Sequence, residues 1–293
     1  MIKLLRLLIA ECFGGIPPKL NGANLFSTEF TTQAQYLEMS QLFNKDGKIL
    51  IRIPIEGNSI NQFIQAATKA NSAGMEVIAS LDSYESTASM INRLQAIKSS
   101  VPSVKYFEIL NELPHMGSLY PGEQVTSLKQ LLDIVNLCSD WVHLNIVGGK
   151  TISMAPYNSM DERSWDTWDG VTNTRILKEL ILYTVADIAA VHLYGDSLGK
   201  KLQLVTLADN IVAWNKEAQY KKKIWVTEVG NEPWNSQTKY YDNMIKLIMN
   251  LINPEKLIWY RQCTKTSTEQ DNGYALETLD TGKHSPLFDK LLS

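Results

Sequence analysis

The sequence predicts an α/β protein folded as a single (β/α)8 TIM barrel over residues 1–293. Two observations predict it. Eight short apolar segments alternate with amphipathic helical patterns along the whole chain. The apolar segments are also hydrophobic throughout, as expected of parallel strands buried on both faces. Strands that alternate with helices favour parallel pairing with right-handed crossovers, and eight such units match a (β/α)8 barrel.

The strand candidates are apolar runs bounded by polar or turn residues. They are the segments 3–10, 48–55, 75–81, 104–110, 150–156, 186–194, 222–228 and 256–262. In the first of them, Lys3 and Arg6 beside leucines also resemble a signal peptide. However, Arg6 interrupts the apolar run and no small-x-small cleavage site follows cleanly. We therefore predict that 3–10 is the first buried strand.

Helical patterns lie between these strands. In 123–141 and 239–251, apolar residues recur with a period near 3.6, which predicts helices with one buried face. A doubly wound open sheet is the alternative architecture for the same alternation. It has no support from a GxGxxG or GxxxxGK[ST] phosphate loop, because the sequence contains neither.

Composition excludes several classes of function. The net charge is −3, without a basic stripe, which argues against nucleic acid or an anionic membrane as the main partner. Three separated cysteines form no CxxC pair, and four scattered histidines show no metal-ligand spacing. No apolar stretch approaches the ~20 residues that span a bilayer. Secretion and a cytoplasmic location both stay open, as does the oligomeric state.

Polar side chains stand where the apolar strands stop. Because active sites of such barrels lie at the C-terminal ends of the strands, these side chains predict a site. Each alone would be weak, since strand ends also carry helix caps and loop residues. Taken along the chain, they are Arg52, Asp82, Asn111, Glu112, His192, Tyr194, Glu228 and Trp259.

Five short motifs carry a resemblance to a known group of enzymes. IRIPI (51–55), FEILNELP (107–114), VHLYG (191–195), WVTEVG (225–230) and LIWYR (257–261) resemble the strand-end motifs of clan A glycoside hydrolases, most closely the cellulase-type family 5. The C-terminal segment from Gly273 resembles the closing turn and final helix of that family. Departures are Asp82 where the family has a histidine, NELP where it has NEP, and a first strand without a clear match.

The resemblance implies a retaining glycoside hydrolase acting on a β-linked oligosaccharide or polysaccharide such as a glucan or mannan, by a mechanism that requires no metal and no organic cofactor. It makes Glu112 the acid/base and Glu228 the nucleophile, with the two carboxyl groups about 5–5.5 Å apart. Glu232, in the later NEP, is interpreted as a loop carboxylate near a helix start. Arg52 and Tyr194 are expected to keep Glu228 ionised by lowering its pKa.

The remaining residues are expected to bind substrate. Asn111 would bond the sugar 2-hydroxyl, and His192 would orient Glu112 or bind substrate. Trp259 would form a stacking floor for a sugar ring. Asp82 and Trp234 join this set. For Trp234, and for the loop residues Trp165 and Trp168, packing and sugar binding both stay open.

Four other functions are compatible with a barrel. A catalytically inactive carbohydrate-binding barrel would lack one carboxylate, whereas Glu112 and Glu228 are both present. A metal-dependent hydrolase or a Schiff-base lyase needs strand-end metal ligands or a strand-end lysine, and neither is found. A transglycosylase would use the same residues and differs in how water competes.

Overall fold

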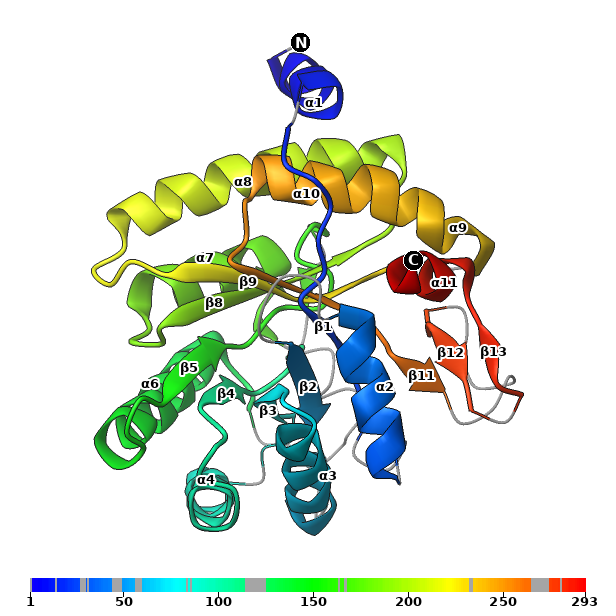
Figure 1. Cartoon of the computed structure of the whole chain (residues 1–293). Helices are drawn as coiled ribbons and strands as arrows, with labels where there is room; N and C mark the ends of the chain where they lie inside the picture. Colours follow the sequence, from blue (N-terminus) through cyan, green and yellow to red (C-terminus); the bar gives the residue numbers. More distant parts are fainter. Residues whose placement is uncertain are drawn as a thin grey trace.

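The centre of the molecule is a closed barrel of eight parallel strands, in the order β1-β10-β9-β8-β5-β4-β3-β2 (Figure 1). The structure is a computed structural model. It describes the whole chain except residues 1, 14, 27–29, 31, 44–48, 56–59, 83, 85, 114–124, 163, 166–167, 232–233, 265–273 and 280. The predicted (β/α)8 TIM barrel is confirmed.

Seven of the barrel strands overlap segments predicted to be strands. The strands are β1 (Gly22–Asn24), β2 (Leu50–Pro54), β3 (Glu76–Leu81), β4 (Tyr106–Ile109), β5 (Lys150–Ser153), β8 (Ile188–Tyr194), β9 (Lys223–Gly230) and β10 (Lys256–Trp259). Short strands outside the barrel are β6 (Ser164–Trp165), β7 (Val171–Thr172), β11 (Cys263–Thr264), β12 (Glu277–Thr278) and β13 (Lys283–His284).

The prediction for the first strand is wrong. Segment 3–10 lies in helix α1 (Ile2–Phe13), which packs outside the barrel on α8 and α10, with Leu7 and Ala10 buried. A short apolar run fits either a strand or a helix, and leucine favours a helix. The strand that closes the barrel is β1, which carries little apolar signal. A Cβ at Gly22 would lie 1.6 Å from the Leu50 carbonyl oxygen, so a glycine is needed where β1 meets β2.

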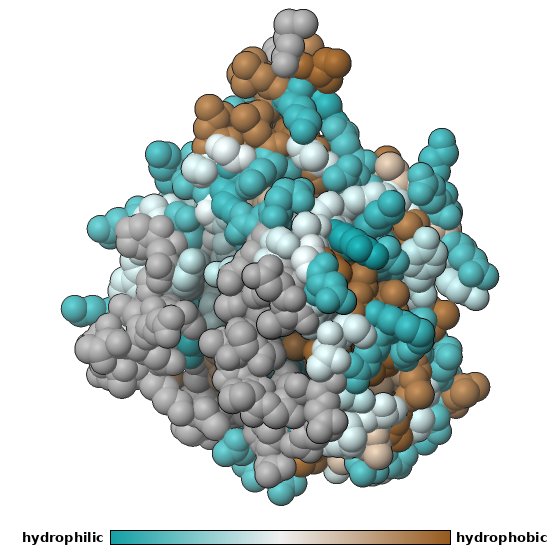
Figure 2. Space-filling model, turned by 180° about the vertical axis from the view of Figure 1, so that it is seen from behind, coloured by the Kyte–Doolittle hydropathy of each residue, from teal (hydrophilic) through white to brown (hydrophobic). Residues whose placement is uncertain are grey.

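The outer face of α1 is apolar and exposed, and Figure 2 shows hydrophobic residues gathered where this helix projects from the body. The exposed side chains are Ile2, Leu4, Leu5, Leu8 and Ile9. Within the described part of the chain, no helix is both long and apolar enough to cross a membrane.

Helices surround the barrel (Figure 1). They are α2 (Gln33–Phe43), α3 (Ile60–Ser72), α4 (Thr87–Ser100), α6 (Leu128–Asn145), α7 (Asn173–Tyr183), α8 (Leu198–Glu217), α9 (Trp234–Tyr240), α10 (Lys246–Leu251) and α11 (Pro286–Leu292). The helix predicted over 123–141 starts at Leu128, where the Ser127 side chain caps it. The helix predicted over 239–251 is confirmed, with a π-helical turn (Tyr241–Ile245) between α9 and α10.

The barrel interior is apolar near its base and polar toward the C-terminal ends of its strands. Ile152, Ile188, Trp225 and Ile258 belong to one buried interior cluster. Residues two apart share one face of a strand, so Leu50 of this cluster is followed on the same face by Arg52. The strand ends therefore surround a buried polar layer, which holds the predicted site.

Candidate active site

The structure brings together the two glutamates and the histidine predicted from the strand ends. Glu112 follows β4, His192 lies on β8 and Glu228 on β9. One ligand-type atom of each side chain lies within 4.8 Å of the other two, and all three residues are buried. These three side chains therefore form one cluster at the C-terminal ends of the barrel strands.

Three side chains contact the carboxyl group of Glu228. Arg52 donates from Nη1 to Oε1 at 2.8 Å, the Tyr194 hydroxyl donates to Oε2, and His192 Nδ1 lies 3.5 Å from Oε2. Burial raises the pKa of Glu228 above its ordinary value, while His192, Arg52 and Tyr194 act in the opposite direction. The predicted contacts are present, and Arg52 and Tyr194 act to lower the pKa of Glu228 as predicted, but its net shift is upward because the desolvation of the buried carboxylate outweighs them.

Glu112 contacts His192 through Oε1, which lies 2.7 Å from Nδ1. The chain reaches this position through two residues in the left-handed region, Leu110 with φ of 67° and Glu112 with φ of 48°. Such backbone costs about 1–3 kcal/mol per residue and is concentrated at functional sites. The Glu112 N–H donates to the Ala155 carbonyl at 3.1 Å, which helps to hold this turn.

His192 is fully buried and links the two glutamates. Its Nε2 lies 3.1 Å from the Thr227 hydroxyl. Burial lowers the pKa of His192, and the Arg52 charge lowers it further against the opposing effect of Glu228. The imidazole is therefore neutral at pH 7, so one ring nitrogen donates and the other accepts.

Arg52 connects the site to the barrel interior. Its Nη2 donates to Asn111 Oδ1 at 3.0 Å and to Ser80 Oγ at 2.8 Å, and its Nε donates to Glu108. Burial alone would lower the pKa of Arg52, but the neighbouring carboxyl groups raise it above its usual value. Arg52 is therefore a fixed cation that contacts both Asn111 and Glu228.

Asp82 joins this network from the end of β3. It is buried, its carboxyl group contacts the Ser80 hydroxyl, and it lies 3.8 Å from Arg52 Nη2. Burial raises the pKa of Asp82 to about 8. Ser80 Oγ is also 2.9 Å from Glu108, and a hydroxyl has one hydrogen for two carboxyl neighbours. A proton on Asp82 satisfies both contacts at pH 7.

Of the two aromatic residues at the end of β10, Trp259 is buried and Tyr260 is partly exposed. Trp259 is fully buried, its ring packs edge-on against Tyr240, and its Nε1 donates to the Tyr274 carbonyl at 2.9 Å. It therefore offers no open face for a sugar, contrary to the predicted floor. The next residue, Tyr260, is partly exposed and packs edge-on against Tyr194 at 6.1 Å between centroids.

The structure gives the burial of two further tryptophans, Trp168 and Trp234. Trp168 is buried, which agrees with packing. Trp234 is half-buried at the start of α9. The side chain of Trp165 and the whole of Glu232 lie outside the described residues.

Sequence reasoning missed Glu108, Ser80, Thr227 and Tyr260. A signal for two of them exists: Ser80 lies two residues before Asp82, and Glu108 two residues after the interior-facing Tyr106, so period-two alternation places them inside the barrel. Ser80 and Glu108 are also register partners on β3 and β4. Thr227 and Tyr260 lie near irregular pairings of β8–β9 and β9–β10, which simple alternation does not foresee.

The cluster has the donor set of an acid–base site. Within the described part of the chain, Glu112, His192 and Glu228 are also the side chains grouped closely enough to coordinate a metal ion. Hydrogen bonds from Arg52 and Tyr194 already occupy both carboxyl oxygens of Glu228. This arrangement fits a pair of carboxyl groups that work in acid–base and nucleophilic chemistry.

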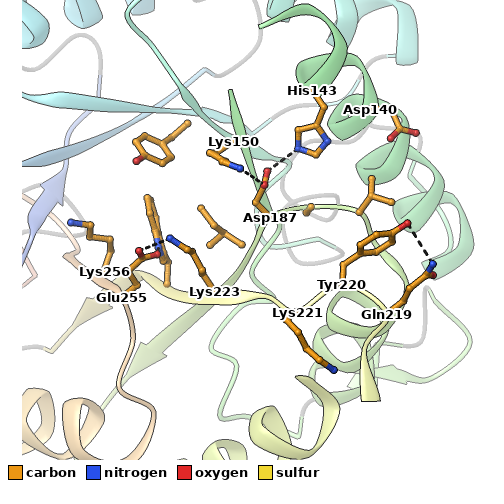
Figure 3. Close-up of a pocket in the computed structure, with 15 residues that line it drawn as sticks. Asp140, His143, Lys150, Asp187, Gln219, Tyr220, Lys221, Lys223, Glu255 and Lys256 are labelled. Carbon is orange, nitrogen blue, oxygen red and sulfur yellow. Dashed lines mark hydrogen bonds and ion pairs between the residues drawn. The ribbon is translucent and has the colours of Figure 1, made fainter. Parts of the chain in front are cut away.

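A cavity of about 780 Å³ lies at the other end of the strands (Figure 3). Charged residues at the starts of β5, β8 and β9 line it, and they pair with one another. Lys150 and His143 both contact Asp187 at 2.8 Å, and Lys223 contacts Glu255 at 2.7 Å. The N-terminal end of such a barrel usually contributes to stability rather than to chemistry. The candidate active site is therefore the cluster of Glu112, His192 and Glu228 at the opposite end.

Comparison with known proteins agrees with the fold. No family model and no curated protein matches the chain. Among solved structures, an endo-β-1,4-glucanase from Xanthomonas axonopodis pv. citri has a TM-score of 0.62 at 13% identity and covers 94% of this chain and 97% of its own. Endoglucanase Cel5A from Pseudomonas stutzeri has a TM-score of 0.61 at 14% identity, covering 96% and 95%.

An endo-1,4-β-mannanase from Rhizomucor miehei is similar too, with a TM-score of 0.59 at 12% identity over 94% of this chain and 96% of its own. At these identities the likeness shows a shared fold. The strand-end motifs predicted similarity to glycoside hydrolase barrels, and the comparison confirms this similarity at the level of the fold.

Proposed function

We propose that the protein is a retaining glycoside hydrolase, with Glu228 as nucleophile and Glu112 as acid/base. The observation that carries the proposal is the cluster of Glu112, His192 and Glu228, whose ligand-type atoms lie within 4.8 Å of one another. Retaining enzymes hold their carboxyl groups about 5–5.5 Å apart, whereas inverting enzymes need about 6.5–9.5 Å to admit a water. The short separation supports retention.

In the first step, the Glu228 carboxylate attacks the anomeric carbon while Glu112 gives its proton to the leaving glycosidic oxygen. The products are a covalent glycosyl ester on Glu228 and a free leaving-group sugar. Arg52 and Tyr194 hold both oxygens of Glu228, so the nucleophile needs little reorientation before attack. Asn111, which accepts a hydrogen bond from Arg52 at 3.0 Å, is the proposed partner of the sugar 2-hydroxyl.

In the second step, Glu112 accepts a proton from water as the water attacks the anomeric carbon. The ester bond breaks and Glu228 leaves as a carboxylate, so the released sugar keeps its original configuration. His192 supports both steps. With its proton on Nε2, toward Thr227, its Nδ1 accepts from Glu112; the other tautomer donates to the ionised Glu112.

The proposed substrate is a β-linked glucan or mannan. The solved structures of similar fold include glucanases and a mannanase. Tyr260, partly exposed beside Tyr194, is the proposed aromatic platform under the sugar at the cleavage point. Asp82, neutral at pH 7 and next to Arg52, and Trp234, half-buried at the start of α9, remain proposed substrate contacts.

The test is hydrolysis of β-glucans, mannans and aryl β-glycosides by the wild type, Glu112→Ala, Glu228→Ala and Glu232→Ala. Glu112→Ala should lose about 10²- to 10⁴-fold for poor leaving groups. Glu228→Ala should lose hydrolysis, and azide should restore turnover as an α-glycosyl azide. Glu232→Ala is the control and should keep its activity. An inactive Glu232→Ala beside active Glu112→Ala and Glu228→Ala would contradict the assignment. Glycan binding without turnover by the wild type would favour an inactive carbohydrate-binding barrel.

A further inference from the structure

We propose that Glu108 is a positioning residue, which orients Arg52 so that Arg52 holds the nucleophile. This inference rests on the proposed function for its meaning in catalysis. Glu108 lies on β4, four residues before Glu112, and is fully buried inside the barrel. It makes a contact with Arg52 Nε, while Arg52 Nη1 binds Glu228 at 2.8 Å.

The geometry of the guanidinium makes this contact informative. The group is planar, with its donors in a fixed arrangement, so fixing Nε sets the directions of Nη1 and Nη2. Glu108 holds Nε, Glu228 receives Nη1, and Asn111 receives Nη2 at 3.0 Å. The orientation of two groups at the reaction centre therefore depends on a carboxylate that lies below them.

The carboxylate of Glu108 has a second contact, with the Ser80 hydroxyl, which lies 2.9 Å from Oε2. The same oxygen contacts Arg52, so Oε2 joins a serine on β3 to an arginine on β2. Glu108 is thus fixed by side chains from β3 and β2, the next two strands of the barrel on one side. Rigid strands hold a site more accurately than loops do, which suits a residue whose task is orientation.

Glu108 is poorly explained by stability alone. Its Oε1 is buried and has no hydrogen-bond partner among the described residues. Leaving a buried polar atom unpaired is unfavourable, and replacing a buried ion pair by apolar residues often stabilises a protein. A role in orienting Arg52 gives a side chain of this length with an acceptor oxygen a reason to be present at this position.

Two substitutions separate position from charge. Glu108→Asp keeps the charge but is one methylene shorter, so it cannot hold Nε in the same place. Glu108→Gln keeps the length and an acceptor oxygen but removes the charge. Positioning predicts that Glu108→Asp is the more damaging change. We expect Glu108→Asp to lower kcat by about ten- to a hundred-fold with little change in KM, and Glu108→Gln to keep most of the activity.

The pKa of Glu228 gives a reading that needs no turnover. It can be followed by carboxyl-carbon NMR titration, with the signal assigned by its loss in Glu228→Gln. A displaced Arg52 no longer stabilises the Glu228 carboxylate, so Glu108→Asp should raise this pKa. Glu108→Gln removes a negative charge while Arg52 stays in place, so it should leave the pKa unchanged or lower it. A wild type without hydrolytic activity would end the proposed function but would leave this test intact.

Thr151→Val is the matched control. Thr151 is buried on the neighbouring strand β5, and no hydrogen-bond partner of its hydroxyl is found among the described residues. It should change neither kcat nor the Glu228 titration. If Glu108→Asp behaves as the wild type while Glu108→Gln is impaired, Glu108 acts through its charge and the proposal is wrong.

A measurement on the wild type covers variants that fail to fold. The Arg52 Nε–H signal, assigned by its loss in Arg52→Lys, should exchange slowly with solvent, because Nε is bonded inside the barrel. Fast exchange of this hydrogen would overturn the proposal, since an arginine that leaves Glu108 frequently is not oriented by it.

Discussion

The Nδ1 atom of His192 lies 2.7 Å from Oε1 of Glu112, so the buried imidazole and the proposed acid/base share one hydrogen. Because the pKa of His192 is lowered by burial, the imidazole is neutral and can accept this hydrogen as well as donate it. The proposed mechanism needs Glu112 in both protonation states, and a neutral histidine can follow that change.

His192→Ala is therefore expected to impair acid catalysis. Its kcat/KM should fall by about ten- to a hundred-fold for substrates with poor leaving groups, and less for dinitrophenyl glycosides, which need little protonation. His143→Ala is the matched control, because His143 contacts Asp187 at the other end of the barrel. Equal losses for both classes of substrate would contradict a role through Glu112.

Tyr194→Phe removes the hydroxyl that donates to Glu228 Oε2. A lost hydrogen bond to a charged group corresponds to about 1.5–3 kcal/mol, or roughly ten- to a hundred-fold in kcat. The Tyr194 contact acts against the raised pKa of Glu228, so its loss should move the acidic limb of the kcat/KM profile to higher pH. Tyr240→Phe removes another buried hydroxyl, bonded to the Leu193 carbonyl, and should lower Tm without moving that limb.

Asp82→Asn should change how stability depends on pH. The pKa of Asp82 is raised from 3.8 to about 8, so the folded protein holds this proton over a range where the unfolded chain has lost it. The wild type therefore loses stability through Asp82 as pH rises from about 4 to 8. Asparagine mimics the protonated carboxyl. The Tm of the variant minus that of the wild type should increase between pH 5 and 9, and parallel Tm curves would argue against a protonated Asp82.

Tyr260→Ala and Trp259→Phe distinguish the two aromatic residues of this strand end. If Tyr260 is the platform, its removal should raise KM for glycans by about ten-fold, with a small effect on Tm. Trp259→Phe loses the bond from Nε1 to the Tyr274 carbonyl and should lower Tm while KM stays near its original value. The reverse outcome, measured by steady-state kinetics and thermal unfolding, would restore Trp259 as the sugar floor.

The fold was predictable where local pattern and tertiary role agree. The segments around β2 to β10 are apolar on both faces because helices cover one face and the barrel interior the other. The first strand was not predictable in this way. In β1, Gly22 is required by close contact with Leu50, and such a contact leaves no apolar signature, whereas the leucine-rich α1 imitates a strand.

The candidate site shows a similar division. Glu112, His192 and Glu228 could be predicted because their polar side chains stand out in the sequence where apolar strands end. The direction in which the pKa of Glu228 shifts could not be predicted, because it depends on how deeply the side chain is buried. The position of Trp259 could not be predicted either. The pairing of β9 and β10 shifts between Leu257 and Trp259, and this shift changes which side chain faces the site.

The most direct test of the central claim is to trap the glycosyl ester and find which residue carries it. The wild type would be treated with an activated 2-deoxy-2-fluoro β-glycoside, digested with trypsin and analysed by tandem mass spectrometry. Glu228 and Glu232 share the tryptic peptide 224–239, and fragment ions that end between them separate the two. Our account predicts a stoichiometric label on Glu228, absent in Glu228→Gln. A label on Glu232 or Glu112, or turnover of natural substrate without any labelled peptide, would contradict it.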